Sequence, residues 1–446
     1  MNPVSRRQFV GGTLAACSLG LTTPLAKALA METGTSTNVR VSHDRYASHT
    51  EPCLAVNPRN PRNLLGACEL PLSVATYVSF NGGRTWRSNG PLPLPFGSPG
   101  GGNVSAAFDD SGRGFVGGLL VTGSGQRGAY VWRTDDGGRT FTPPLELGTG
   151  AALDRPWLAT ESGESRAVHV VWSNGSSSAL ATSLGYTRST DGGQTFEAPR
   201  VIARVAAGLG NPVVACGAPG AVYVLYGGGS GALESATDVP MTVNVVCSRD
   251  GGLTFARPIE LGRGEDLISF PDLRLGATSP APLARNSSLP AIAADPVTGV
   301  VCAVYTVHSA GAKHADVMLT ASRDDGRSWS RPVAVTPPDQ VIYFEPQVAI
   351  DRGRIGVMAF ALTQGLVSVV MMQSAPDSLR FSSPIAVTDQ PFNPVRVADP
   401  NGRLQLGDYQ ALATTPGAFH PLWNDARTGR LQLYTAVVLA SGISRP

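Results

Sequence analysis

The sequence predicts an all-β protein folded as a seven-bladed β-propeller of four-stranded antiparallel blades. Two observations lead to this prediction. An eight-residue pattern recurs at intervals of 52 to 74 residues, which is the length of a four-stranded blade with its loops. The composition agrees, because 52 Gly, 35 Pro and only 15% charged residues suit a chain of strands and turns rather than helices.

The recurring pattern is Ser or Thr, any residue, Asp, any residue, Gly, any residue, Thr or Ser, and then Trp or Phe. It is intact at 134–141, 189–196, 248–255 and 322–329, has Asn for Asp at 79–86, and keeps only its first Ser and last aromatic at 374–381. Each copy is interpreted as a hairpin turn in which the Asp binds the turn backbone, Gly adopts positive φ, and the aromatic packs between sheets. These aspartates are therefore expected to be structural rather than catalytic.

Each unit is expected to place three short strands before the pattern and one after it. In the third unit these strands are 155–160, 167–173, 184–189 and 198–203, which are apolar runs separated by turn residues. The first strand of each unit starts with a characteristic pair, often X-Pro, followed by small apolar residues. Seven such starts are present: Glu51-Pro52, Asn103-Val104, Arg155-Pro156, Asn211-Pro212, Leu289-Pro290, Glu345-Pro346 and Asp408-Tyr409.

The last unit supplies only three strands, so its fourth strand must come from elsewhere in the chain. Residues 38–43 precede the first unit and resemble outer strands such as 331–335. We expect them to complete the last blade, because this pairing closes the ring and removes an exposed sheet edge. A six-bladed propeller is the alternative if this strand pairs elsewhere.

The N-terminus contains Arg6-Arg7, a following apolar run rich in Gly and Ala, and Ala-Leu-Ala at 28–30. This arrangement resembles a twin-arginine export signal. We therefore predict export to the periplasm or the exterior, and a single propeller domain over residues 31–446. A lipid anchor on Cys17, in a lipobox at 14–17, is the alternative interpretation.

Composition also limits the partners. Without the leader, basic and acidic side chains nearly balance, so no general attraction to nucleic acid is expected. No later segment is long and apolar enough to span a membrane.

The scattered cysteines form no metal-binding pattern, and we expect no cofactor, no metal and a monomer. Cys53 and Cys68 flank a turn symmetrically, so they are expected to form either a disulfide or two buried thiols.

Candidate functional residues lie where the first strands start. In a propeller these starts and the loops from second to third strands share one face, whereas the recurring turns lie on the other. This face is therefore expected to carry the pocket. An insertion at 262–288 reaches the same face and is interpreted as a lid or an excursion without fixed structure.

The recurring turns resemble the Asp-box, or BNR, repeat of sialidases and their relatives. Further stretches, at 51–58, 154–157, 406–410 and 423–427, resemble bacterial secreted proteins of the sialidase-like group. The resemblance implies a propeller over the whole mature chain and a carbohydrate-active role. A strict sialidase also has three arginines that bind the sugar carboxylate, a Tyr nucleophile activated by Glu, an Asp acid/base, an Arg-Ile/Leu-Pro motif and six blades. Residues 41–69 contain no such motif, which argues against a strict sialidase.

The chemistry of such sites suggests a role for each candidate. Tyr409 with Glu345 or Glu51 could form a nucleophile pair, or Asp408 with these glutamates could form the paired carboxylates of a hydrolase. The predicted catalytic residues are thus Asp408, Tyr409, Glu345 and Glu51. The predicted substrate-binding residues are Arg155, Asp154, Trp157, Asp425, Arg427 and Arg285. For each of them an ordinary role in packing, strand ends or salt bridges is the alternative.

Three functions remain open from the sequence. The first is an exported, sialidase-like glycoside hydrolase that acts on acidic glycans. The second is a non-catalytic propeller that binds glycan or protein in the cell envelope. The third is a uronate polysaccharide lyase, in which Tyr or His would be the base and Arg would neutralise the uronate carboxylate.

Overall fold

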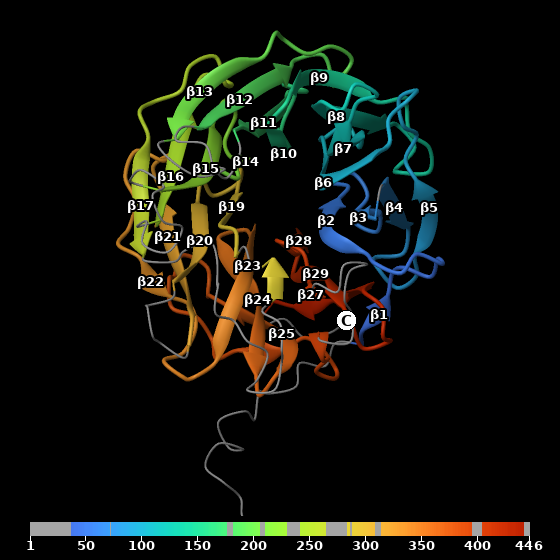
Figure 1. Ribbon diagram of the computed structural model, residues 1–446. Coiled ribbons are helices and arrows are strands. Elements are labelled where there is room, and N and C mark those ends of the chain that lie inside the picture. Colours follow the sequence, from blue (N-terminus) through green and yellow to red (C-terminus); the bar gives the residue numbers. More distant parts are fainter. Residues whose placement is uncertain are drawn as a thin grey trace, which may run out of the picture.

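The computed structural model describes residues 37–71, 73–175, 182–205, 210–229, 241–264, 283–285, 288–307, 314–394 and 404–440. The sheets in these ranges form a ring of seven blades around a central channel (Figure 1). The predicted seven-bladed, all-β propeller is therefore confirmed. No helix in the described part of the chain has the length and apolar character needed to cross a membrane.

Blades 1 to 4 each contain four consecutive antiparallel strands. Blade 1 is β2 (Thr50–Val56), β3 (Leu64–Leu70), β4 (Ser73–Ser79) and β5 (Arg87–Pro91). Blade 2 is β6 (Gly100–Phe108), β7 (Gly114–Val121), β8 (Arg127–Thr134) and β9 (Leu145–Gly150). Blade 3 is β10 (Leu153–Thr160), β11 (Val168–Asn174), β12 (Thr182–Ser189) and β13 (Arg200–Val205). Blade 4 is β14 (Val213–Cys216), β15 (Val222–Gly229), β16 (Met241–Ser248) and β17 (Ile259–Gly264).

The remaining blades complete the ring. Blade 5 is β19 (Ala291–Ala294), β20 (Val301–Val307), β21 (Asp316–Ser322) and β22 (Val333–Ala334). Blade 6 is β23 (Ile342–Asp351), β24 (Arg354–Thr363), β25 (Leu366–Gln373) and β26 (Ile385–Ala386). Blade 7 is β28 (Ala411–Thr415), β29 (Ala418–Asp425), β30 (Gln432–Thr435) and β1 (Val39–Arg40), with β31 (Val438–Leu439) also paired to β29. Outside the blades, β18 (Leu283–Arg285) pairs in parallel with β27 (Leu404–Gln405).

The N-terminal strand closes the ring as the sequence predicts. In blade 7, β1 pairs antiparallel with β30, with Val39 opposite Thr435 and Arg40 opposite Tyr434. The Ser42 hydroxyl and the Arg40 guanidinium both donate to Gln432 Oε1, at 2.8 Å each. In Figure 1 the N-terminal strand lies beside the C-terminal strands of the last blade. The six-bladed alternative is therefore excluded, because residues 38–43 supply the missing outer strand.

The hydrophobic core is divided among the seven junctions between neighbouring blades. The aromatic residue of each turn packs into the junction with the preceding blade: Trp86, Phe141, Phe196, Phe255, Trp329 and Phe381. Burying an aromatic ring stabilises a fold by roughly 1.5–3 kcal/mol. The aromatic residues of the recurring turns therefore help to hold neighbouring blades together.

The turn at 189–196 has the predicted internal bonds. Asp191 accepts from the Ser189 hydroxyl at 2.7 Å and from the Thr195 hydroxyl at 2.6 Å, and Ser189 Oγ accepts from the amide of Gly193 at 2.8 Å. In the next copy, the hydroxyl and amide of Thr254 lower the pKa of Asp250 to about 2. These carboxylates hold the turns, which agrees with the structural role expected for them.

Cys53 and Cys68 are free, buried thiols in the structure. Cys53 lies opposite Ala67, and Cys68 lies opposite Ala75. The hairpin is thus one residue out of the symmetrical arrangement, and a one-residue offset sends the two side chains to opposite faces of the sheet. Of the two expectations from the sequence, the structure shows the buried thiols.

The turn glycines provide a test of this architecture. Gly193 and Gly299 both have positive φ, 76° and 72°. A Cβ added to Gly193 would lie 2.5 Å from the Phe115 ring, whereas a Cβ added to Gly299 would meet nothing within 4 Å. We expect Gly299→Ala to cost about 1–2 kcal/mol from backbone strain, and Gly193→Ala to cost about 1–3 kcal/mol more from overpacking. Urea unfolding measures both, and equal losses would contradict the proposed fastening of blades.

Candidate functional site

Five of the seven first strands share an unusual backbone conformation at their start positions. Glu51, Asn103, Arg155, Asn211 and Glu345 have φ between 42° and 54°, a region that side chains other than glycine seldom occupy. At four of the blades the strand pairing shifts at this point, which marks a β-bulge. A bulge re-aims a side chain at a strand end. The shared strain therefore points to function, because such conformations gather at binding and catalytic sites.

Aligned on the first strands, the seven start positions are Glu51, Asn103, Arg155, Asn211, Leu289, Glu345 and Asp408. Only Leu289 is apolar, and all of them except Asn103 are buried. Buried polar groups persist when they are paired or bind a ligand. The start positions thus form a polar ring at the mouth of the central channel.

An ion pair joins two distant blades across this ring. Arg155, at the start of blade 3, donates from Nη1 to Asp408 Oδ2 at 2.9 Å, although the two residues are 253 positions apart. Both side chains are almost fully buried, with 7% and 11% of their surface exposed. Burial opposes the charge of Arg155, but the carboxylates of Asp408 and Glu51 outweigh it and raise the pKa of Arg155 above its usual value.

This pair separates two cavities along the propeller axis. A cavity of about 420 Å³ on one side has Arg155 and Asp408 in its wall. A space of about 30 Å³ lies between Arg155, Trp157 and Tyr409. Beyond it a cavity of about 330 Å³ is lined by the first strands of all seven blades, including Trp157 and Gln410. The larger cavity has a volume typical of sites for small ligands.

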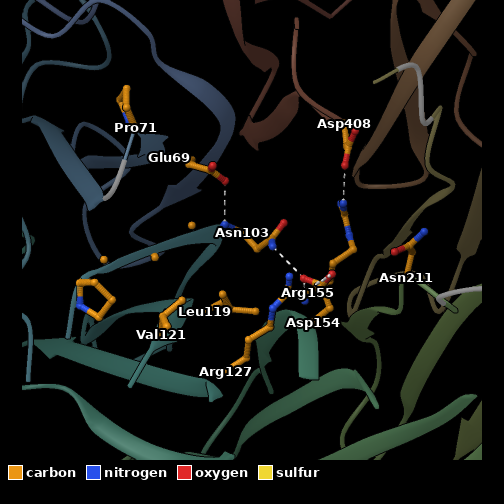
Figure 2. Close-up of a pocket in the computed structure, with 14 residues that line it drawn as sticks. Glu69, Pro71, Asn103, Leu119, Val121, Arg127, Asp154, Arg155, Asn211 and Asp408 are labelled. Atoms are coloured by element: carbon orange, nitrogen blue, oxygen red, sulfur yellow. Dashed lines mark hydrogen bonds and ion pairs between the residues drawn. The ribbon is translucent and has the colours of Figure 1, made fainter. Parts of the chain in front are cut away.

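A hydrogen-bonded network forms the polar part of the larger cavity (Figure 2). Asp154 accepts from Asn103 Nδ2 at 2.9 Å, from Arg127 Nη1 at 3.1 Å and from the amide of Arg155 at 3.0 Å. Glu69 accepts the amide of Asn103 at 3.1 Å. Asp154 thus accepts three hydrogen bonds, which suits a residue that positions its neighbours.

The two sides of the cavity differ in character. Figure 2 shows Asp408, Arg155 and Asn211 on one side, and Pro71, Leu119 and Val121 on the other. Two buried oxygens on the polar side, Asp408 Oδ1 and Asn211 Oδ1, have no hydrogen-bond partner. Leaving a buried acceptor unsatisfied is costly. Because both oxygens are closed off from solvent, a ligand donor reaches them only after the side chain turns toward the cavity.

Tyr409 does not line the larger cavity. Its hydroxyl donates to the carbonyl of Val104 at 3.0 Å, and its ring packs edge-on against Trp157 with centroids 5.1 Å apart. Burial and the carboxylate of Glu51 raise the pKa of Tyr409 well above its usual value. These contacts favour a packing role for both aromatics, so a nucleophilic Tyr409 stays a prediction without geometric support.

Glu345 and Glu51 lie buried in the polar ring. Glu345 Oε2 accepts from Gln410 Nε2 at 2.8 Å, and burial raises the pKa of Glu345 well above its usual value, with the charge of Asp408 adding to the effect. Glu51 packs under Gly407, where an added Cβ would lie 3.0 Å from the Glu51 amide nitrogen. Neither glutamate is among the residues that line the larger cavity, so the structure brings them beside Asp408 rather than into contact with a ligand there.

Asp425 and Arg427 come together in a separate cluster. Arg427 donates to Asp425 at 2.8 Å and to Asn38 at 3.0 Å, and it also binds Asp389, while Asp425 accepts from the Trp423 indole at 3.1 Å. The cluster ties blade 7 to the residue before β1 and to the segment after β26. Neither residue lines the larger cavity, and the contacts match the salt bridge that was the alternative to substrate binding.

Some predictions lie outside the described residues. They include the export signal at 1–30, Cys17 and most of the insertion at 262–288. At the end of this insertion, the backbone of Arg285 pairs with Gln405.

Sequence reasoning missed Glu69 and Arg127 as cavity residues. Glu69 lies near the end of β3 and Arg127 at the start of β8, so both flank a loop from a second to a third strand. Such loops belong to the pocket face by topology. Applying that rule to the residues beside the loops, as well as to the loops themselves, would have found both.

Solved structures share the propeller fold. A protein of unknown function from Dyadobacter fermentans aligns over 91% of this chain and 99% of its own, at 11% identity and a TM-score of 0.50. The α-L-arabinofuranosidase of Fusarium graminearum, solved with an iminosugar inhibitor, aligns over 93% of this chain and 99% of its own, at 13% identity and a TM-score of 0.49. A Hadza microbial sialidase shows 15% identity and a TM-score of 0.46 over 72% of this chain, which spans 65% of the sialidase.

At these identities the likeness concerns the fold. No family model and no curated protein sequence matches the chain.

The ion pair between Arg155 and Asp408 can be tested by a double-mutant cycle. We expect Arg155→Met to destabilise the protein by about 3–5 kcal/mol, because it leaves a buried carboxylate without its counter-charge. Adding Asp408→Asn should recover part of this loss, so the double variant should be more stable than the sum of the single variants predicts. Urea unfolding at neutral pH measures all three, and simple additivity would contradict the coupling.

The raised pKa of Glu345 predicts a pH dependence of stability. An unfolded glutamate ionises near pH 4.3, whereas folded Glu345 keeps its proton to higher pH. Its contribution is therefore fully present below the unfolded pKa and is lost as pH rises toward the folded pKa, by up to about 1.4 kcal/mol per pH unit. Glu345→Gln should remove this slope and keep an acceptor for Gln410. Parallel stability curves between pH 5 and 8 would contradict the prediction.

Proposed function

We propose that the protein is a glycoside hydrolase whose substrate binds in the 420 Å³ cavity. The observation that carries the proposal is the state of Asp408. One of its oxygens is fixed by Arg155, while the other is buried, without a partner, in a residue that lines the cavity. A sugar hydroxyl that satisfied this oxygen would bring the carboxylate next to the bound sugar, with Arg155 holding its other oxygen.

Hydrolysis of a glycosidic bond requires a second carboxyl group. One group protonates the leaving oxygen, while the other acts at the anomeric carbon, directly or through a water molecule. Glu69 is the candidate for the second role, because it also lines the cavity and its carboxylate is held by the amide of Asn103. Asp408 then acts at the anomeric carbon, and Glu69 supplies the proton. In this proposal the buried residues beside Asp408 have a structural role; they are Glu345, Glu51 and Tyr409.

The charges of the cavity favour a neutral sugar. Its two arginines, Arg127 and Arg155, are both bound to aspartates. Glu69 adds a further acid, so among the described residues of the lining both cations already have an acidic partner. Hydroxyl groups, in contrast, can donate to Asp408 and Asn211. We therefore favour a neutral glycan over the acidic glycan that the sialidase resemblance implies.

The other two functions receive less support. For a lyase with Tyr409 rather than a His as base, the geometry is unfavourable, because the Tyr409 hydroxyl donates to Val104 and its pKa is raised. A binding protein without activity is the second candidate, because Asp154 accepts three hydrogen bonds, one of them from Arg127, as in a rigid recognition surface. The twin-arginine pattern at 6–7 supports export, so the glycan would be met outside the cytoplasm.

Enzyme assays on the purified mature protein test the proposal. The substrates are one- to four-residue series of arabino-, xylo-, manno-, cello- and galacto-oligosaccharides, with sialyllactose and oligogalacturonate as acidic comparisons. We expect cleavage of a neutral series, and a loss of about 10²–10⁴-fold in kcat for Asp408→Asn and Glu69→Gln. Asp377→Asn is the control, because that aspartate is exposed in a surface ion pair with Arg323.

Two results would contradict the hydrolase. Absence of product from every series, with binding retained, would favour the binding protein instead. Full activity of Asp408→Asn would exclude the assigned carboxylate.

A further inference from the structure

Phe96 is exposed to an unusual degree. Its relative exposure is 107%, and it is the only aromatic among the exposed large hydrophobic residues of the described ranges. Aromatic side chains normally lie in cores and binding sites because water around a ring is unfavourable. A single exposed apolar residue needs no explanation by itself, so the exposure of Phe96 is informative only together with its position in the fold.

The turn that carries Phe96 is well anchored. The amide of Ser98 donates to the carbonyl of Pro95 at 3.1 Å, which closes a turn with Phe96 at its second position. The carbonyl of Pro93 accepts the Trp132 indole at 2.8 Å, and the Ser98 hydroxyl donates to the carbonyl of Val121 at 2.7 Å. The ring is thus presented to solvent by a fixed turn with a proline on each side of it, so little entropy is lost when it is covered.

The same segment leads directly into the wall of the cavity. Pro99 follows Phe96 by three residues, a reach of at most about 10 Å. Pro99 lines the cavity together with Pro71, Leu119 and Val121, which form its apolar side. The bond from Ser98 to Val121 fixes the turn to this wall. Phe96 itself is outside the cavity lining, and it lies within the span of these three residues from the apolar side.

We propose that Phe96 forms a second sugar subsite, where it stacks on the ring next to the one bound in the cavity. This inference rests on the proposed function and extends it from a single sugar to a glycan of two or more residues. Sugar rings have an apolar face of C–H groups and a polar rim of hydroxyls. A sugar ring can therefore stack its apolar face on the exposed ring of Phe96 while its hydroxyls stay in water. A protein partner would need a larger apolar patch than one ring offers.

Binding of the neutral oligosaccharide series tests the subsite, measured by calorimetry on the full mature chain. In the wild type the second residue should raise affinity, and Phe96→Ala should remove most of this gain, by about tenfold. Binding of the monosaccharide should not change, and Phe96→Trp should keep the gain. Leu253→Ala is the matched control, because Leu253 is 57% exposed on an Asp-box turn of the opposite face.

The outcomes separate the two proposals. Equal loss for monosaccharide and disaccharide, or an unchanged dependence on length in Phe96→Ala, would overturn the subsite while the proposed function stands. If the wild type binds no member of any series, the proposed function fails and the subsite fails with it.

Discussion

The ion pair between Arg155 and Asp408 is the contact on which the candidate site depends. It joins blade 3 to blade 7 across the axis and separates the outer cavity from the channel behind it. It also orients the other oxygen of Asp408, which is buried without a hydrogen-bond partner. A buried ion pair contributes little net stability. Its role here lies in fixing the position of the Asp408 carboxylate and in closing the end of the channel.

The polar ring around this pair shows how one repeated fold supports a varied site. Five of the seven blades deliver their start residue in the left-handed conformation, and four of these have a bulge at that point. Proline follows at Glu51, Arg155, Asn211 and Glu345, which restricts the backbone further. The geometry is shared, but the side chains are two glutamates, two asparagines, an arginine, an aspartate and a leucine. Architecture and chemistry are thus encoded at different positions of the repeat.

This separation explains what could be predicted from the sequence. The turns recur with the same residues because each performs the same local task, so they revealed the blades, and the shortage of one strand in the last unit revealed the closure by residues 38–43. The start positions were found in the same way, including Arg155 and Asp408. Their partners were not, because the pairing of residues 253 positions apart depends on blade geometry. Glu69 carries only the topological signal of its place beside a loop of the pocket face, and Cys53 and Cys68 are one residue of register away from lying opposite each other.

The shared last blade also sets the order in which the molecule can assemble. Contacts such as Arg40 with Gln432 span 392 residues, whereas strands within other blades are neighbours in sequence. Because long-range closure is slow and late in folding, six blades can form while the ring is still open. Asp44 meanwhile holds the N-terminal segment near blade 1, through the hydroxyl of Tyr77 at 2.6 Å and the ring of His49 at 2.9 Å. The ion pair between Arg155 and Asp408 needs blade 7 in place, so we expect this side of the cavity to form last during folding.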